Sequence, residues 1–329
     1  MLPCDLPIVQ APMAGGPSTP ALAAAVASAG GLGFVAGGYL APGALRSAIA
    51  DTQALTSAPL GVNLFLPSSP ADPAAVGAYA RRLQPEADRL GVALGEPRWD
   101  DDGYPAKLAV VVAAAPRLVS FTFGCPPAAD VAQLHRAGCQ VAVTVTSAAE
   151  ARQAEAAGTD LLIVQGTEAG GHQGQFADDA PNRTLLLDAL AAVRAVSALP
   201  MIAAGGVMTD ADLRRVLAAG AIAVQVGTAL LCTPEAGTSA VHRRALLERR
   251  YPDTVLTRAY SGRHGRGLRN RFAGFDAPAA YPEVHRLTRP LRAAAAAAGD
   301  DSVPNLWAGT GWASVQDAPA AAVVRAIAG

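Results

Sequence analysis

Short apolar segments alternate with helical patterns along about the first 230 residues of the chain. The apolar segments show no regular polar face, so we expect strands that are buried on both faces, as in a parallel sheet covered by helices. The predicted strands are Pro7–Met13, Leu32–Ala36, Leu60–Phe65, Leu118–Phe123, Gln140–Thr146, Leu161–Gln165, Pro200–Ala204 and Ala223–Ala229.

Segments rich in Ala, Leu and Arg separate these strands and predict the helices Pro20–Ser28, Gly43–Ala54, Pro73–Leu90, Ala128–Arg136, Ala148–Ala156, Thr184–Val196 and Asp210–Ala218. Eight strands alternating with helices predict a (β/α)8 TIM barrel, because the alternative, an open doubly wound sheet, usually has fewer strands. Residues Gly31–Ala36 fit the pattern GxGxxA, but they follow a helix and open a strand. A dinucleotide-binding loop has the reverse order, so this motif also favours the barrel.

The composition changes after Cys232. Residues 233–304 are rich in Arg and predict a smaller, mainly helical second unit on the substrate side. Residues 305–329 contain the predicted helix Ala318–Ala328 and are expected to return to the barrel formed by residues 1–232.

Composition and charge exclude several classes of protein. The chain has 329 residues, 51% of them hydrophobic, and its 26 basic and 27 acidic residues give a net charge of −1. The absence of a basic block argues against a nucleic-acid partner. Four scattered cysteines predict neither a disulfide framework nor a structural zinc site. The N-terminus lacks a signal-peptide pattern, and prolines and glycines interrupt the uncharged run Leu6–Leu45, so we expect a cytoplasmic protein with no membrane partner.

Candidate chemistry lies where the predicted strands end, since barrel enzymes place their sites there. His172 follows the sixth strand in a glycine-rich loop that includes Gly170 and Gly171, and it alone among five histidines has no arginine within two residues. His135, His242, His264 and His285 are therefore expected at the surface. His172 is a catalytic candidate, and the alternative is that it only hydrogen-bonds to loop backbone.

The last two strands are followed by Gly205–Gly206 and by Gly227–Thr228. Such loops often form a phosphate site in barrels, although paired glycines also make tight turns. The last strand also carries Gln225 and Val226. Asn63 and Gln165 are amides in otherwise apolar strands. A flavin ring would provide hydrogen-bond partners for Asn63 and Gln165, and neighbouring backbone is the alternative partner.

Several catalytic patterns are missing, among them HExxH, GxSxG and the P-loop. Lys107 is the only lysine and lies away from the strand ends, which argues against Schiff-base chemistry. Carboxylates are sparse there too, so we expect no metal site. An organic cofactor that carries the chemistry is the remaining interpretation.

A set of longer motifs extends over nearly the whole chain. It consists of Gln10–Phe34, Gly61–Phe65, Ser120–Gly124, Thr144–Ser147, Val164–Phe176, Ile202–Val207, Gln225–Leu231, Arg258–Phe272 and Leu306–Gly309. In these motifs the chain resembles the class I nitronate monooxygenases, which are FMN-dependent (β/α)8 enzymes with a second domain over the barrel mouth. The resemblance implies that FMN is held by Met13, Asn63, Gln165, Gly170, Gly171, Gly205, Gly206, Gln225, Val226, Gly227 and Thr228.

The resemblance also implies a reaction. An alkyl nitronate, such as propionate 3-nitronate, and O2 would give a carbonyl compound and nitrite through a flavin semiquinone, without NAD(P)H. His172 would remove the α-proton of a neutral nitroalkane or, as imidazolium, pair with the nitronate. The Ala-rich helices fit either a core or a homo-oligomer contact.

The alternatives are an FMN-dependent NAD(P)H reductase acting on enoyl-ACP or a quinone, and a barrel that binds flavin without turnover.

Two positions depart from the family pattern. Gln173 stands where a basic residue is expected, and Thr310 stands where a glutamine is expected. Both are expected near the substrate mouth, where they would change substrate preference.

Overall fold

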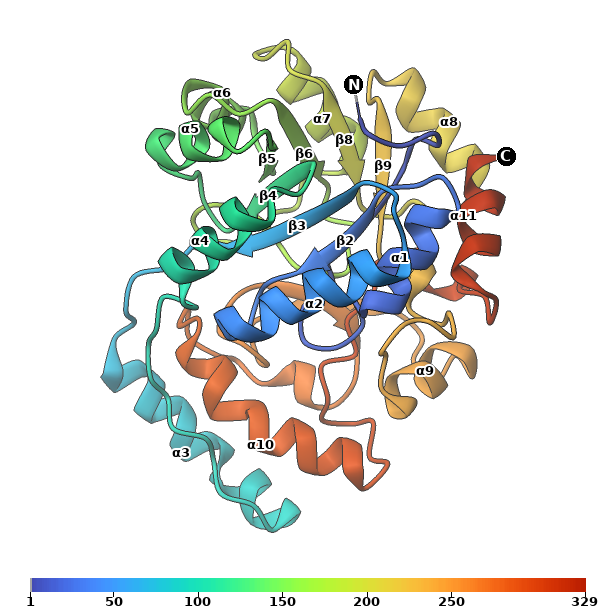
Figure 1. The fold of residues 1–329 in the computed structure, drawn as a ribbon. Helices are drawn as coiled ribbons and strands as arrows, with labels where there is room; N and C mark the ends of the chain where they lie inside the picture. Colours follow the sequence, from blue (N-terminus) through green and yellow to red (C-terminus); the bar gives the residue numbers. More distant parts are fainter. Residues whose placement is uncertain (1) are drawn as a thin grey trace.

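The computed structural model describes residues 2–329, in which eight parallel strands surround one axis (Figure 1). Their order around the sheet is β1 (Ile8–Gln10), β9 (Ala223–Val226), β8 (Met201–Ala204), β6 (Leu161–Gln165), β5 (Gln140–Val145), β4 (Leu118–Thr122), β3 (Leu60–Phe65) and β2 (Gly33–Ala36). A parallel bridge between Val9 and Leu32 joins the first and last strands of this order, so the sheet is nearly closed. The predicted TIM barrel is confirmed.

Helices cover the outside of this barrel. They are α1 (Pro20–Ser28), α2 (Pro42–Leu55), α4 (Tyr104–Ala114), α5 (Ala128–Arg136), α6 (Ala148–Ala156), α7 (Leu186–Arg194) and α8 (Asp210–Ala218), with α11 (Ala320–Ala328) against α1 and α8. Helix α11 thus packs against helices that cover the barrel. In the part of the chain that the structure describes, no helix is long and apolar enough to span a membrane.

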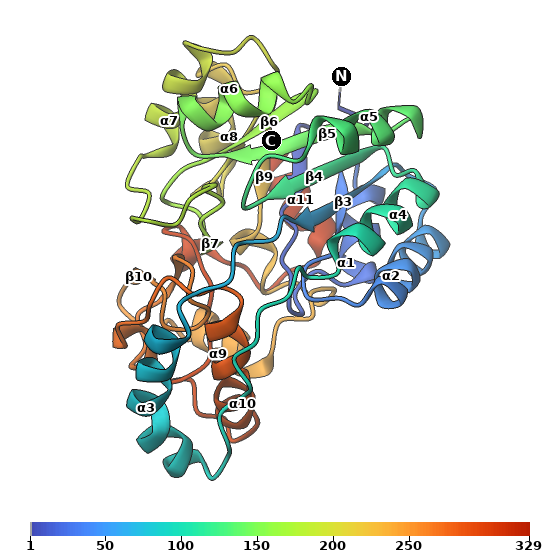
Figure 2. The same ribbon diagram turned by 90° about the vertical axis from the view of Figure 1, so that its left-hand side faces the viewer.

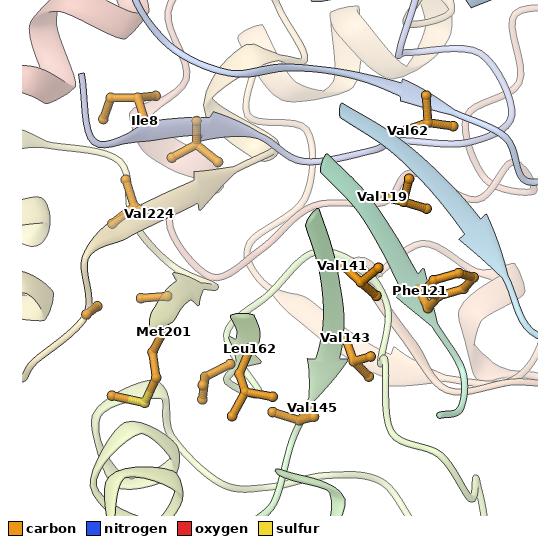
Figure 3. Close-up of a cluster of buried hydrophobic side chains, with 14 of the residues drawn as sticks. Ile8, Val62, Val119, Phe121, Val141, Val143, Val145, Leu162, Met201 and Val224 are labelled. Carbon is orange, nitrogen blue, oxygen red and sulfur yellow. The ribbon is translucent and has the colours of Figure 1, made fainter. Parts of the chain in front are cut away.

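Alternate residues of each strand point to opposite faces and build two apolar layers. The outer layer packs under the helices and includes Val141, Val143 and Val145 of β5 (Figure 3). The inner layer fills the barrel near the start of the strands, with residues such as Phe34 and Ile163. Towards the carboxyl ends the inward positions become polar, namely Asn63, Thr122, Thr144, Gln165 and Gln225. This polar layer forms the floor of the site described below.

Helix α3 (Pro73–Leu90) has the predicted bounds but packs away from the barrel. Its apolar face lies against α10 (Glu283–Ala297), and the two helices lie side by side in Figure 2. The helix between β3 and β4 that covers the barrel is α4, which was not among the predicted helices. Residues 1–232 therefore contribute one helix to a second apolar cluster, which includes Leu83 of α3, Leu287 of α10 and Phe272.

The segment 233–304 is less helical than expected. It contains α9 (Ala240–Leu247) and α10, but also the antiparallel strands β10 (Thr254–Thr257) and β11 (Gly265–Leu268). The short strand β7 (Gly171–His172) pairs with β11. Because β7 belongs to the loop after β6, this small sheet connects that loop to the second cluster and fixes the position of His172.

Candidate active site

A cavity of about 510 Å3 lies at the carboxyl ends of the barrel strands. Its wall is formed by strand ends, by the loops after β6, β8 and β9, and by one face of α10. All of the predicted site residues line it, namely Met13, Asn63, Gln165, Gly170, Gly171, His172, Gly205, Gly206, Gln225, Val226, Gly227 and Thr228. The structure therefore brings the predicted set together around one space.

Two buried amide side chains on the cavity floor each have one polar atom without a hydrogen-bond partner. The Asn63 Nδ2 donates to Ser120 Oγ at 2.9 Å and to Thr122 Oγ1 at 3.1 Å, while its Oδ1 accepts no hydrogen bond from residues 2–329. The Nε2 of Gln225 has no acceptor in the same range. Buried polar atoms are normally hydrogen-bonded, so an open acceptor and an open donor indicate a polar ligand.

Gln165 behaves differently from these two amides. Its Oε1 accepts from the Gly174 N–H at 2.7 Å, and its Nε2 donates to the His172 carbonyl at 3.2 Å. Of the two alternatives left open by the sequence, backbone bonding therefore applies to Gln165. Its side chain holds the loop that carries His172.

Backbone geometry explains several glycines in the loops after β6 and β8. Gly205 and Gly206 have φ angles of 120° and 72°, which side-chain-bearing residues rarely adopt. A Cβ on Gly170 would lie 2.4 Å from the Gly309 nitrogen, so the loop after β6 requires a glycine where it meets the C-terminal segment. Thr228 Oγ1 accepts from the Gly309 N–H at 2.9 Å, which ties the loop after β9 to the same segment.

His172 lies among aromatic rings at one side of the cavity. Its ring centroid is 5.7 Å from those of Phe123 and Tyr281 and 5.3 Å from that of Trp307. Burial lowers the pKa of His172 to about 3, the charge of Arg263 acts in the same direction, and Asp178 opposes it. His172 is therefore neutral near pH 7, and the imidazolium role considered from the sequence would require a much more acidic solution.

A hydrogen-bond chain orients the His172 ring. Its Nε2 lies 2.7 Å from Ser261 Oγ, and Ser261 Oγ lies 3.2 Å from the Arg263 carbonyl. Both contacts are satisfied when Nε2–H donates to Ser261 and the serine hydroxyl donates to that carbonyl. This assignment leaves the lone pair on Nδ1, which bonds to no other residue of the described chain.

Two histidines expected at the surface line the cavity instead. Burial lowers the pKa of His242 to about 4 and holds the pKa of His285 well below its usual range. His285 stacks on Tyr39 with centroids 4.3 Å apart. An arginine next to a histidine in the sequence does not show that the histidine is exposed, because neighbouring residues of a helix point to different faces. His264 is also largely buried against Asp178, whereas His135 is exposed as expected.

Arg289 and Arg292 also line the cavity, from α10, and were not among the predicted site residues. Their spacing of four and seven residues from His285 places all three on one helical face. That spacing was the available signal, but only the packing of α10 shows which face meets the cavity.

The two departures from the family pattern do not line the cavity. Both amide atoms of Gln173 bond to the backbone of Asn182, at 2.8 and 2.9 Å, so this side chain stabilises a loop. The Thr310 side chain is exposed next to Gly206. The Gln173 side chain is therefore bonded to loop backbone and is not part of the cavity wall.

Comparisons with known proteins agree with this geometry. A family model described as nitronate monooxygenase matches residues 4–327. The chain is 40% identical to the nitronate monooxygenase of Paraburkholderia phytofirmans, with 98% of this chain and 92% of the relative aligned. It is 41% identical to that of Pseudomonas aeruginosa, with 99% and 96% aligned.

Solved structures share the fold of this chain. Nitroalkane oxidase from Streptomyces ansochromogenes has a TM-score of 0.96 and 48% identity, covering 99% of this chain and 95% of that one. FabK from Thermotoga maritima has a TM-score of 0.75 and 27% identity, covering 98% and 92%. The family match and the relatives thus span nearly the entire chain. The chain belongs to the nitronate monooxygenase family and is an oxidoreductase of that family.

Proposed function

We propose that the protein oxidises alkyl nitronates, such as propionate 3-nitronate, with bound FMN and O2, giving a carbonyl compound and nitrite. The observation that carries this proposal is the cavity at the strand ends. It is lined by a neutral His172 and by buried polar atoms that lack a hydrogen-bond partner in the protein. When bound, FMN would take electrons from the nitronate and pass them to O2.

The residues of the cavity fit a flavin mononucleotide. Asn63 Oδ1 and Gln225 Nε2 offer an acceptor and a donor to the polar edge of the ring, and Met13 and Val226 offer apolar wall. The backbone at Gly205–Gly206 and Gly227–Thr228 would hold the phosphate, because amides at such turns bind anions. The segment 233–304, together with α3, would form the substrate side.

His172 favours the nitronate over the neutral nitroalkane as substrate. A general base works best when its pKa is near the working pH, and a ring with a pKa of about 3 is a weak base at pH 7. A nitronate arrives already deprotonated and does not need this base. Ser261 would keep the Nδ1 lone pair available for the slower removal of a proton from a nitroalkane.

The alternative function is an NAD(P)H-dependent reductase on the same barrel, which the fold shared with FabK keeps open. One experiment separates the two. The purified protein is mixed anaerobically with propionate 3-nitronate and, separately, with NADH, and the flavin absorbance is followed. We expect a rapid change with nitronate, nitrite after air is admitted, and no bleaching by NADH. Bleaching by NADH without a response to nitronate would replace this proposal with the reductase. Mass spectrometry of the released cofactor tests FMN itself.

A further inference from the structure

The wall of the cavity carries a positive charge that no carboxylate of residues 2–329 neutralises. Arg292 lines the cavity from α10, and all of its protein partners are neutral. No acidic oxygen in that range lies within 4.0 Å of its guanidinium. Arg292 is partly buried, and a cation largely removed from water normally has a counter-ion, so the cavity is the place where one would bind.

The Arg292 side chain is held in place before any ligand arrives. Nε donates to Thr288 Oγ1 at 3.1 Å, one Nη to Asn305 Oδ1 at 2.7 Å, and the other Nη to the His285 carbonyl at 3.0 Å. A further contact with His285 Nδ1 at 3.3 Å leaves one of the five N–H donors free. Although burial lowers the pKa of Arg292 to about 10, the group remains charged at neutral pH.

The other basic groups near the cavity are neutral, lie outside its wall or are exposed at its rim. His172, His242 and His285 are neutral because burial depresses their pKa. Arg263 lies over the Phe123 ring, 4.2 Å from its centroid, donates to the backbone carbonyls of residues 173 and 175, and is not part of the cavity wall. Arg289 is exposed at the rim and makes no hydrogen bond with the described residues.

We propose that Arg292 binds the negative charge of the nitronate and thereby sets a preference for anionic over neutral substrates, an inference that rests on the proposed function. The free N–H of Arg292 would donate one charge-assisted hydrogen bond to an oxygen of the planar nitronate group. The role considered for a charged His172 is thus assigned to α10.

Binding of nitrate tests this proposal without turnover. Nitrate is a planar anion that the enzyme cannot oxidise, and its affinity is measured on the FMN-loaded protein by calorimetry and by the change in flavin absorbance. We expect Arg292→Gln to weaken nitrate binding about 30-fold, the loss of one charge-assisted hydrogen bond. Arg292→Lys, which keeps the charge, should weaken it less. Arg214→Gln removes an exposed charge from α8 and should leave nitrate binding unchanged.

Kinetics with a matched pair of substrates completes the test. For Arg292→Gln we expect kcat/KM for ethyl nitronate to fall about 30-fold, mainly through KM, and kcat/KM for neutral nitroethane to change less than about threefold. Nitrate affinity equal to that of the wild type in a folded Arg292→Gln protein would refute the proposal. Weakened FMN binding with unchanged nitrate binding would refute it too, and would assign Arg292 to the cofactor phosphate. A wild-type protein that binds nitrate through Arg292 but oxidises no nitronate would refute the proposed function and leave the anion site supported.

Discussion

His172 lies between the rings of Phe123, Tyr281 and Trp307, with its Nε2 against Ser261. The sequence indicated this histidine through its glycine-rich loop, but the protonation state follows from burial and from Arg263, which the loop sequence does not reveal. The same limit applies to His242 and His285, whose neighbours in sequence suggested the opposite environment. At this scale the sequence identifies the residue and the packing determines its charge.

Replacing His172 by Gln should separate its two possible roles. We expect FMN to stay bound, because the floor and the glycine loops are unchanged. Turnover of neutral nitroethane should fall about 100-fold, the low end of the roughly 10²- to 10⁴-fold that a positioned base contributes, because a pKa of about 3 makes this ring a weak base. Turnover of ethyl nitronate should fall no more than about tenfold. Steady-state nitrite production with both substrates measures this, and equal losses for both would contradict the assignment of His172 as a base for the nitroalkane alone.

The bounds of many helices could be predicted from local signals. Thr19 and Ser147 cap α1 and α6, and Thr209 with Asp212 forms a capping box on α8, so these helices begin where the sequence indicated. Helix α4 was missed because it contains three successive valines, 110–112, which favour strands when taken alone. The partner of α3 was missed because an amphipathic face shows that a helix is buried but not what buries it.

Helix α4 also carries the only lysine of the chain, which holds part of the cavity wall. Lys107 is buried, with its Nζ 2.7 Å from Asp102 Oδ2 and donating to the Gly37 carbonyl at 2.8 Å. Asp102 Oδ1 accepts from the backbone N–H of Tyr39, a cavity residue with a φ of 67°. The pair therefore links α4 to a backbone turn that the cavity needs.

Lys107→Met should lower the free energy of unfolding by about 3–5 kcal/mol, because it leaves the Asp102 carboxylate buried without its partner. The double variant Lys107→Met/Asp102→Asn removes both charges and should recover part of that loss. Urea unfolding of the two single variants, the double variant and the wild type gives the coupling energy. Additive losses would show that the ion pair contributes nothing beyond its separate members.

On the scale of the whole molecule, the cavity forms where the barrel meets the second apolar cluster. Three contacts hold these parts together: Arg266 Nε donates to the Thr167 carbonyl at 2.7 Å, and Arg258 Nε and His264 Nδ1 bind Asp178 at 2.9 and 2.8 Å. Every predicted site residue lies on the barrel or its loops. There the predicted strand ends are enough to indicate functional positions from the sequence, because barrel enzymes place their sites at these ends. Arg292 and His285 were not predicted, because only the assembled molecule shows which face of α10 lies against the barrel.

This assembly buries three neutral histidines, His172, His242 and His285, and makes stability depend on pH. In the unfolded chain their pKa is about 6.5, whereas in the folded protein burial lowers it to about 3 for His172, to about 4 for His242 and well below the usual range for His285. Between pH 6.5 and 4 the unfolded state therefore binds more protons than the folded state, and stability falls as the solution is acidified.

Each such histidine contributes up to about 1.4 kcal/mol per pH unit in this window. The carboxylates with lowered pKa, such as Asp178, act in the same direction only at lower pH, near 4 and below. His242→Gln should therefore reduce the slope of unfolding free energy against pH by about one histidine's contribution, while the flavin stays bound. Urea unfolding of the FMN-loaded protein and of this variant, at pH 6.5, 5.5 and 4.5, measures both slopes. Parallel lines for the two proteins would mean that His242 is protonated in the folded state, and that the α9 side of the cavity admits enough water to solvate its charge.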